Sequence, residues 1–363
     1  EDENYQKAYK RYASLDDAIA KGGYRLYVPG YNDAMINTAA VMQIAQILTK
    51  YKVKPVYDLW VCGTAGEEGK GNLAGMKQLY GYSQDTGKGN NALNFVANIS
   101  ADSTRPGSGA VNYLGSYRFE IKYIEPKGVK AGAQQPSALM AMNRAVAAIA
   151  DLKTPYDLDK KAERTTYTVG VGECTKAPEG GRSEECTLMV DMRSPTPEPL
   201  LAIRSKIEPK FQEAMDAENA KFGLKKGDPK AVRMELVWFG DRPAHRRTNY
   251  DDPVVQIHWQ AADTVGIDQR KALAEGASSL NDNVPAAVGV PTININVGTP
   301  AAGGGGHTWY EWGIPGDGKA EGNRVYRMIL MGLMAAGYNT ADGKVVKPLL
   351  DPMGKRTTEE VYK

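Results

Sequence analysis

The middle of the sequence contains an order of secondary-structure elements that few folds share. The patterns are, in chain order, a strand at 117–124, a helix at 137–152, strands at 166–173 and 186–193, a long helix at 197–222 and a strand at 231–239. The strands alternate apolar and polar side chains, and the helices carry apolar residues at three- and four-residue steps. This β-α-β-β-α-β order is that of a ferredoxin-like unit. We therefore expect a complete inserted domain at residues 113–239.

The sequence on either side of this insert alternates helical patterns with short apolar runs of strand length. Residues 34–50, 253–265 and 324–337 are typical of helices with a buried face. The run at 56–62 is largely apolar, which indicates a strand covered on both faces, as in a parallel sheet. A further strand is expected at 291–297. The prediction is an α/β fold in which residues 1–112 and 240–363 form one discontinuous domain around a central, mostly parallel sheet.

The length and charge of the chain limit the classes of function that it can have. A chain of 363 residues is long enough for two domains. Its 45 basic residues are interspersed with 43 acidic ones, for a net charge of +2, so the charge pattern does not indicate a nucleic-acid partner. No apolar run approaches the roughly 18 residues that cross a bilayer, and we expect no membrane partner.

Acidic residues follow the ends of the predicted buried strands. Glu67 and Glu68 come after the first strand, Asp102 follows a shorter strand at 95–99, and His307 follows the last strand and four consecutive glycines. Ligands in open α/β sheets bind beyond the carboxyl ends of strands. Carboxylates gathered there repel one another unless a cation neutralises them, and carboxylates with imidazole suit zinc. Asp33, at the start of the first helix, belongs to the same predicted rim.

Several segments around these residues resemble one family of hydrolases. The segment Asp58–Lys77, which contains Gly66-Glu67-Glu68-Gly69, is similar to the Gly-Glu-Glu-Gly segment of the dizinc exopeptidases and amidohydrolases related to peptidase T, carboxypeptidase G and aminoacylase. The resemblance extends over nearly the whole chain. The other matching segments are Pro29–Asp33, Gly304–Trp312, Asp191–Ser194 and Asp241–Ala244. It implies a zinc-exopeptidase-like catalytic domain interrupted by a ferredoxin-like lid domain.

The resemblance also implies roles for individual residues. Asp33 would bridge two zinc ions, Glu68 and His307 would complete the ligands of one ion, and Asp102 would bind the other. Glu67 would be the general base, taking a proton from the attacking water and passing it to the leaving amine. The candidate substrate-binding residues are Arg193, Arg242 and Asn283. Either arginine could offer a fork to a substrate carboxylate, and the alternative for both is a surface ion pair. The other histidines, His245 and His258, are expected to be ordinary surface or helix residues.

Three positions depart from the family pattern. The family has a His-x-Asp pair before the bridging Asp, but only 32 residues precede Asp33 and none of them is His. Either the N-terminus of this sequence is incomplete, which is the favoured explanation, or the second metal site is degenerate. Val129 stands near the place of a lid histidine, and Asn281 stands in place of an Asp. These departures put activity and ordinary substrate preference in doubt.

The cysteines leave a further question open. Cys174 and Cys186 flank the loop between two predicted neighbouring strands, and both a disulfide and two separate thiols fit this spacing. A disulfide would imply a periplasmic or secreted protein, which we favour over a cytoplasmic one. Cys62 lies in an apolar run and is expected to pack as a small buried residue.

The leading hypothesis is a zinc-dependent exopeptidase or amidohydrolase that cleaves a peptide or N-acyl amide bond in a small substrate, since a lid encloses what it binds. The resemblance adds a homodimer formed through the lid. The alternative is a catalytically impaired pseudoenzyme that serves as a binding module. A serine or cysteine hydrolase is disfavoured, because the sequence has no Gly-x-Ser-x-Gly elbow and Cys62 lies inside an apolar run.

Overall fold

The chain divides into two compact units. The computed structural model describes residues 25–83, 88–102, 109–128, 134–152, 165–175, 183–247, 251–267, 277–295, 297, 302–314 and 319–350. Unit 1 comprises residues 1–64, 88–112 and 247–363, and unit 2 comprises residues 65–87 and 113–246. The sequence predicted an inserted domain at residues 113–239. In the structure, residues 65–87 and 240–246 cluster with this domain as well. The contacts between the two stretches, described below, account for this difference.

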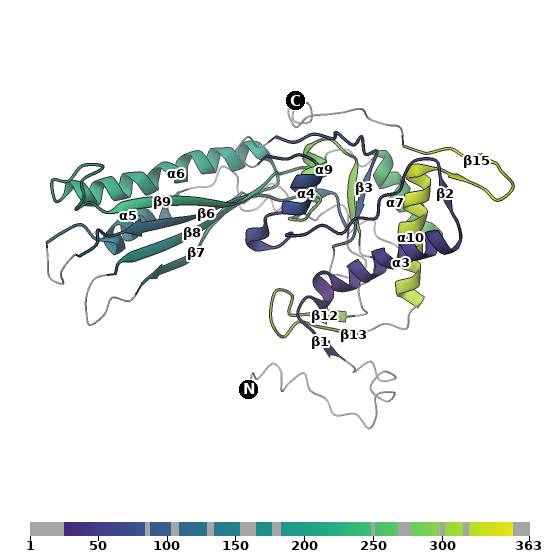
Figure 1. The fold of residues 1–363 in the computed structure, drawn as a ribbon, viewed down its shortest axis with the longest axis horizontal. Coiled ribbons are helices and arrows are strands. Elements are labelled where there is room, and N and C mark those ends of the chain that lie inside the picture. The colour runs from purple at the N-terminus through teal and green to yellow at the C-terminus, as the bar shows by residue number, and fades with distance from the viewer. Residues whose placement is uncertain are drawn as a thin grey trace, which may run out of the picture. The chain divides into compact units, whose positions relative to one another are not determined.

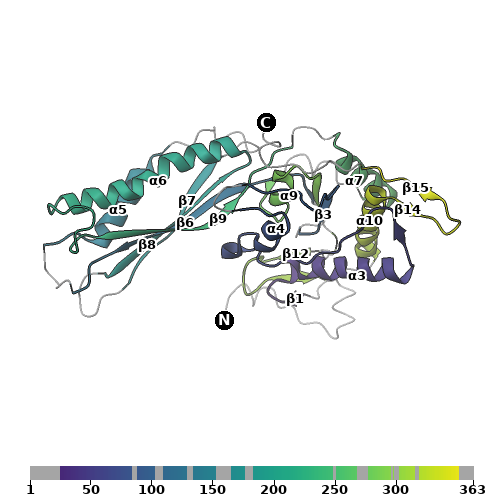
Figure 2. The same cartoon turned by 45° about the horizontal axis from the view of Figure 1, so that its top comes forward.

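Unit 2 is built on an antiparallel sheet of the ferredoxin-like type. Its strands are β6 (Gly115–Ile124), β7 (Thr166–Cys174), β8 (Glu185–Ser194) and β9 (Arg233–Arg242), and its helices are α4 (Ala74–Leu79), α5 (Ala138–Ala150) and α6 (Pro197–Ala220). The strand order is β7-β8-β6-β9, with all neighbours antiparallel. Figures 1 and 2 show α5 and α6 lying along this sheet. The predicted β-α-β-β-α-β insert is therefore present.

The alternation of β6 explains how this sheet and its helices hold together. Phe119, Ile121 and Tyr123 are fully buried against α5 and α6. The rings of Phe119 and Phe211 meet edge to face at 5.4 Å, and the Tyr123 hydroxyl donates to the Phe211 carbonyl at 3.1 Å. A buried tyrosine that finds such a partner avoids the cost of an unpaired polar group. The same burial raises the pKa of Tyr123 well above its ordinary value.

Unit 1 contains a short buried sheet and several helices. Its helices are α3 (Ile36–Lys50), α7 (Pro253–Thr264), α9 (Asn283–Ala287) and α10 (Lys319–Ala336), and its strands include β1 (Leu26–Tyr27), β2 (Lys54–Pro55), β3 (Asn98–Ser100), β4 (Gly109–Ala110), β11 (Thr292–Ile295), β12 (Ala302–Gly304), β13 (Trp312–Ile314), β14 (Tyr338–Asn339) and β15 (Val345–Val346). Strand β11 pairs with β3 in parallel and with β4 in antiparallel orientation. All four residues of β11 are buried, as expected of a strand covered on both faces.

Helices α3, α7 and α10 pack around this sheet and form the core of unit 1 with it. Figures 1 and 2 show the three helices grouped beside β3. Their apolar faces meet Ile293 and Ile295 of β11 in one buried cluster. Helix α7 begins at the predicted Pro253, and the Asp252 side chain caps it by accepting from the Val254 amide at 3.0 Å. The α/β fold class of the prediction is confirmed.

The predicted strand at 56–62 is wrong. The amides of Val56 and Tyr57 donate to carbonyls at the end of α10, but residues 59–62 have no regular structure. Trp60 is more than half exposed and Cys62 is an exposed free thiol, contrary to the expected burial. An apolar run becomes a strand only where a neighbouring backbone completes the ladder, and in the described part of the chain that pairing ends at Tyr57.

Two further features complete the description of the fold. Cys174 and Cys186 are joined by a disulfide, so the structure selects one of the two alternatives left open by the sequence. None of the helices in the described part of the chain has the length and apolarity that a membrane crossing requires.

Candidate metal and hydrolase site

The loop that carries Asp33 is a tight turn before α3. Gly30 has φ = 78°, which glycine adopts without cost, and a π-helical turn spans Tyr31–Met35. The peptide bond between Asp33 and Ala34 is cis. The Asp33 side chain is 17% exposed, so its carboxylate remains accessible at the start of the helix. Asp33 thus lies in the turn directly before α3.

A buried glutamate, which the sequence did not predict as a site residue, holds this loop in place. The Glu311 carboxylate accepts hydrogen bonds from the amides of Gly30, Asn32 and Asp33 at 2.8, 2.6 and 3.0 Å. Glu311 is only 1% exposed, and it directly precedes β13, which pairs with β1 and β12. Three amide donors on one carboxylate compensate for its burial. The backbone around Asp33 is therefore fixed from the opposite end of the chain.

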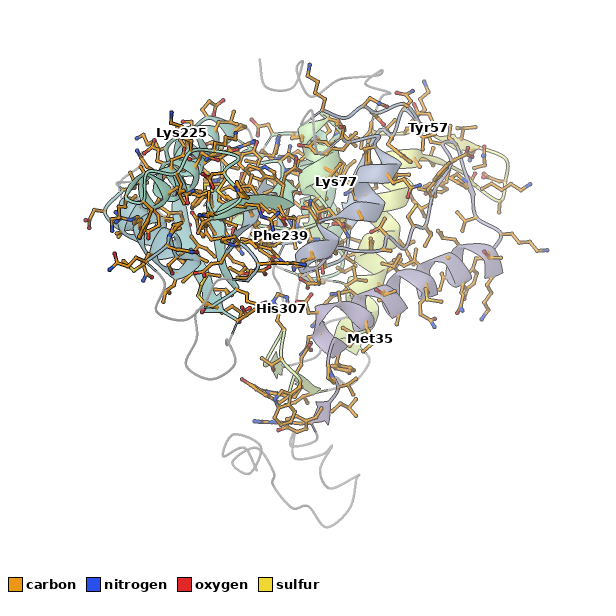
Figure 3. The ribbon with its side chains drawn as sticks, turned by 60° about the vertical axis from the view of Figure 1, so that its left-hand side comes forward. Met35, Tyr57, Lys77, Lys225, Phe239 and His307 are labelled. Carbon is orange, nitrogen blue, oxygen red and sulfur yellow. A yellow bond between two sulfur atoms is a disulfide. The ribbon has the colours of Figure 1, made fainter. Side chains whose placement is uncertain are left out.

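His307 meets Asp33 within unit 1. It lies on the loop between β12 and β13, three residues beyond Gly304, and its own φ is 64°. Gly305, with φ = 72°, shares this left-handed geometry and packs against Tyr310. Figure 3 shows His307 projecting from this loop. Its Nε2 atom lies 2.7 Å from Asp33 Oδ2, while 68% of the side chain is exposed.

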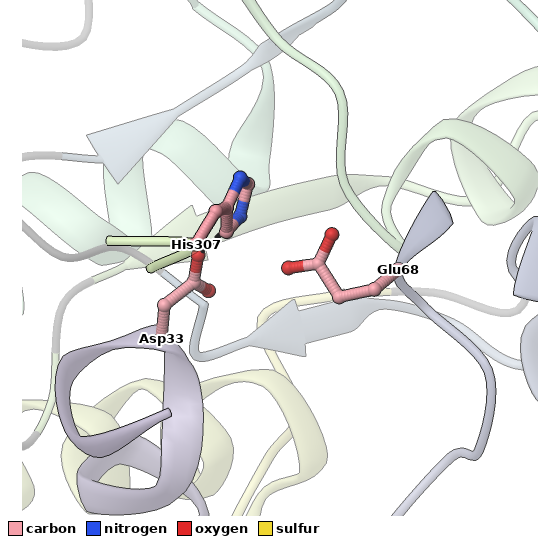
Figure 4. Close-up of side chains that lie close together, drawn as sticks. All are labelled: Asp33, Glu68 and His307. Carbon is pink, nitrogen blue, oxygen red and sulfur yellow. Dashed lines mark ion pairs between the residues drawn. The ribbon is translucent and has the colours of Figure 1, made fainter. Parts of the chain in front are cut away.

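The Asp33–His307 pair has the chemistry of a zinc site. Carboxylate oxygen and neutral imidazole nitrogen are both common zinc ligands, and here they converge from distant parts of unit 1. Figure 4 draws the side chains of Asp33 and His307 close together. Because the carboxylate is fixed through Glu311 and the imidazole is exposed on one side, an ion could approach the pair from solvent. The donor set therefore fits the metal that the resemblance implies.

Glu67 and Glu68 lie in unit 2, in the loop before α4. Arg242, at the end of β9, donates from Nη1 to Glu67 Oε1 at 2.9 Å and from Nη2 to the Glu67 carbonyl. Burial lowers the pKa of Arg242, while the charge of Glu67 opposes that shift. Arg242 was predicted to bind a substrate carboxylate, but its guanidinium is engaged by Glu67 in the structure. Glu68 is exposed.

The two other predicted substrate-binding residues have local partners. Arg193 donates to the Asp191 carboxylate at 3.0 and 2.8 Å and remains 40% exposed, so part of its fork faces solvent. Asn283 is fully buried at the start of α9, and its Oδ1 accepts from the Leu280 amide at 2.7 Å. Arg193 keeps the exposure that a substrate contact needs, whereas Asn283 has a structural hydrogen bond.

Asp102 lies two residues beyond the end of β3 and is partly buried. Within the described ranges it does not join Asp33 and His307 in a three-residue group of potential ligands. Its role at a second metal ion stays a prediction. Val129, near the expected lid histidine, lies outside the described residues. Asn281 donates to Thr64 Oγ1 at 3.1 Å.

The acidic residue beside Asn281 belongs to a buried network. Asp282 is fully buried and accepts from Ser100 Oγ at 2.6 Å, from Asn98 Nδ2 at 3.1 Å and from Asn294 Nδ2 at 3.2 Å. Burial raises the pKa of Asp282 to about 6, although these hydrogen bonds act in the opposite direction. The network ties the ends of β3 and β11 to α9. We regard it as a structural support of the strand ends.

Comparisons with known proteins identify the fold. No family model matches the chain, and no curated protein matches it by sequence. A tripeptidase from Staphylococcus aureus is similar in structure, with a TM-score of 0.54 and 17% identity over 83% of this chain and 70% of the other. Aminopeptidase PepT from Bacillus cereus gives 0.50 and 19% over 83% and 71%, and human carnosine dipeptidase 1 gives 0.53 and 12% over 85% and 73%. The chain therefore has the fold of these peptidases, as the sequence resemblance predicted.

Proposed function

We propose that this protein is a metal-dependent hydrolase that cleaves a peptide or N-acyl amide bond in a small substrate. The observation that carries the proposal is the contact between Asp33 and His307, a carboxylate and an imidazole 2.7 Å apart in unit 1. Solved structures with the same fold are named as a tripeptidase, an aminopeptidase and a dipeptidase. The fold and the donor pair thus support the same class of reaction.

In this proposal Asp33 and His307 hold zinc with Glu68 as a further ligand, and Asp102 contributes to a second ion. When bound, zinc would supply Lewis acidity that lowers the pKa of water and polarises the scissile carbonyl. Glu311 keeps Asp33 oriented through the three amides that it accepts. Glu67 takes the proton of the attacking water and donates it to the leaving amine.

The substrate side of the proposal rests on exposure and charge. The partly exposed guanidinium of Arg193 would bind a carboxylate of a short peptide or N-acyl amino acid. The ferredoxin-like unit would act as a lid and as a surface for homodimer formation. The disulfide between Cys174 and Cys186 supports a periplasmic or secreted location.

Hydrolysis of a panel of di- and tripeptides and N-acyl amino acids tests the proposal. We expect chelation to abolish activity, zinc to restore it, and Glu67→Gln to lower kcat by about 10²- to 10⁴-fold, the range of general acid–base catalysis. Glu173→Gln, an exposed glutamate on β7, is the matched control and should keep full activity. If Glu67→Gln hydrolysed as fast as the wild type, the assignment of the base would fail. If the protein bound no metal and hydrolysed no member of the panel, the binding-module alternative would be favoured instead.

A further inference from the structure

We propose that Arg242 is the residue that positions Glu67, rather than a residue that binds substrate. One guanidinium contacts both parts of the same glutamate: Nη1 donates to the side-chain Oε1 at 2.9 Å, and Nη2 donates to the main-chain carbonyl. The Arg242 side chain is 4% exposed and the Glu67 side chain 19%. The contact therefore fixes the side-chain rotamer and the backbone of Glu67 together.

Arg242 is itself held by the sheet of unit 2. It is the last residue of β9 and pairs with Ser116 of β6 in the antiparallel ladder. The residue before it, Asp241, accepts from Lys77 Nζ of α4 at 2.8 Å in a buried ion pair. The Asp241 amide also donates to Asn72 Oδ1 at 3.1 Å. The end of β9 thus contacts residues 67–77 at three places.

The loop that carries Glu67 has little regular structure of its own. Gly66 and Gly69 have φ values of 72° and 46°, and a Cβ on Gly71 would lie 2.7 Å from the Gly66 Cα. The loop is therefore compact, but the helix that follows it, α4, has only six residues. The first residues of α4 hold the start of the loop, since the amides of Ala74 and Gly75 donate to the carbonyls of Gly66 and Ala65 at 3.2 and 2.9 Å. The contacts from β9 hold Glu67 itself, through its side chain and its carbonyl.

The geometry explains why arginine is needed at this position. A planar guanidinium presents several donors in a fixed fork, whereas a lysine ammonium is a single point of charge on a flexible stem. Lysine could reach the Glu67 carboxylate or its carbonyl but would not fix both. The inference rests on the proposed function, in which Glu67 is the general base. A misplacement of about 1 Å at such a group costs on the order of 100-fold in rate.

The first experiment measures the loop without relying on activity. Hydrogen exchange of the peptide covering residues 65–73 is compared in wild type, Arg242→Met, Arg242→Lys and Lys70→Met. Lys70 lies in the same loop, is exposed, and pairs with Glu120 at 3.3 Å, so it controls for loss of an ion pair. We expect at least tenfold faster exchange in both Arg242 variants and less than a twofold change in Lys70→Met. Unchanged exchange in both Arg242 variants, with wild-type thermal unfolding, would overturn the inference.

The second experiment measures kcat and KM of the same variants on the best substrate of the panel. We expect kcat to fall about 100-fold in Arg242→Met and Arg242→Lys, with KM within threefold of wild type. In a Glu67→Gln background, Arg242→Met should lower kcat by less than threefold further, because both changes act on one group. A rise in KM at constant kcat would instead assign Arg242 to the substrate and overturn the inference. Full activity of Glu67→Gln would refute the proposed base, while the exchange experiment would still decide whether Arg242 holds the loop.

Discussion

At the scale of single residues, the site depends on how buried charges are compensated. Glu311 is buried but accepts three amides, and Arg242 is buried but binds Glu67. His258 of α7 is different. It is fully buried, and neither ring nitrogen has a hydrogen-bond partner among the residues that the structure describes. Its protonation is therefore opposed by its surroundings.

The free energy of unfolding should depend on pH in a way that includes a contribution from His258. Burial lowers the pKa of His258 to about 3, and the nearby charge of Arg327 acts in the same direction. The unfolded chain has a histidine pKa of about 6.5, so between these values the unfolded state binds the proton and the folded state does not. The free energy of unfolding therefore falls as pH is lowered, by about 2 kcal/mol between pH 8 and pH 5. His258→Leu should remove this part of the dependence.

Urea unfolding at pH 8 and pH 5, with chelator present, measures the difference between variant and wild type. Asp282 acts with the opposite sign. Its raised pKa of about 6 keeps a proton on the folded state, so its contribution is lost as pH rises from about 4 to 6. That contribution is common to both proteins and cancels in the comparison. An equally steep loss of stability in His258→Leu would show that His258 is not the group concerned.

At the scale of elements, the disulfide stabilises the β7–β8 hairpin at the end where the two strands are connected. Cys174 and Cys186 are direct partners in the register of the two strands and 12 residues apart in sequence. A cross-link over a loop of this length stabilises by about 3 kcal/mol in the loop-entropy account. The double variant Cys174→Ser/Cys186→Ser should lower the free energy of unfolding of unit 2 by that amount. Cys62→Ser, at the exposed free thiol, should change it by less than about 0.5 kcal/mol.

Denaturant unfolding with and without reductant measures this effect. Reductant should destabilise the wild type to the level of the double variant and leave the double variant unchanged. Equal stability of the wild type and the double variant under oxidising conditions would contradict the assigned role of the disulfide.

At the scale of the whole molecule, elements with a clear periodicity of apolar side chains could be predicted from the sequence. Contacts between segments far apart in the chain could not. The alternation of Phe119, Ile121 and Tyr123 is visible in the sequence, and it is what buries β6. The run at 56–62 looked like a strand because apolar composition does not reveal whether a partner backbone exists. Residues 65–87 cluster with unit 2, and the sequence does not reveal this because the Lys77–Asp241 and Glu67–Arg242 pairs join segments far apart in the chain.

The candidate site also contains residues that the sequence predicted and one that it did not. Asp33 and His307 were predicted from the strand-end rule and the resemblance, and the structure brings them together. Glu311 was not predicted as a site residue, although it stands four residues after His307. Its carboxylate accepts hydrogen bonds from three backbone amides. Every residue type except proline has such an amide, so the sequence does not indicate which amides the carboxylate contacts. The signal that the sequence offered is its place in the segment Gly304–Trp312, which resembles the family segment that carries His307.

The central claim is that Asp33 and His307 bind a metal ion, and zinc titration of the purified protein tests it most directly. Competition against a chromophoric chelator gives the stoichiometry and affinity. The account predicts at least one zinc ion per chain, and an affinity at least 100-fold weaker in Asp33→Asn and in His307→Gln. It predicts unchanged binding in Asp58→Asn and His245→Gln, which carry the same substitutions away from the pair. Absence of zinc binding in the wild type, or undiminished binding in Asp33→Asn and His307→Gln, would contradict the account.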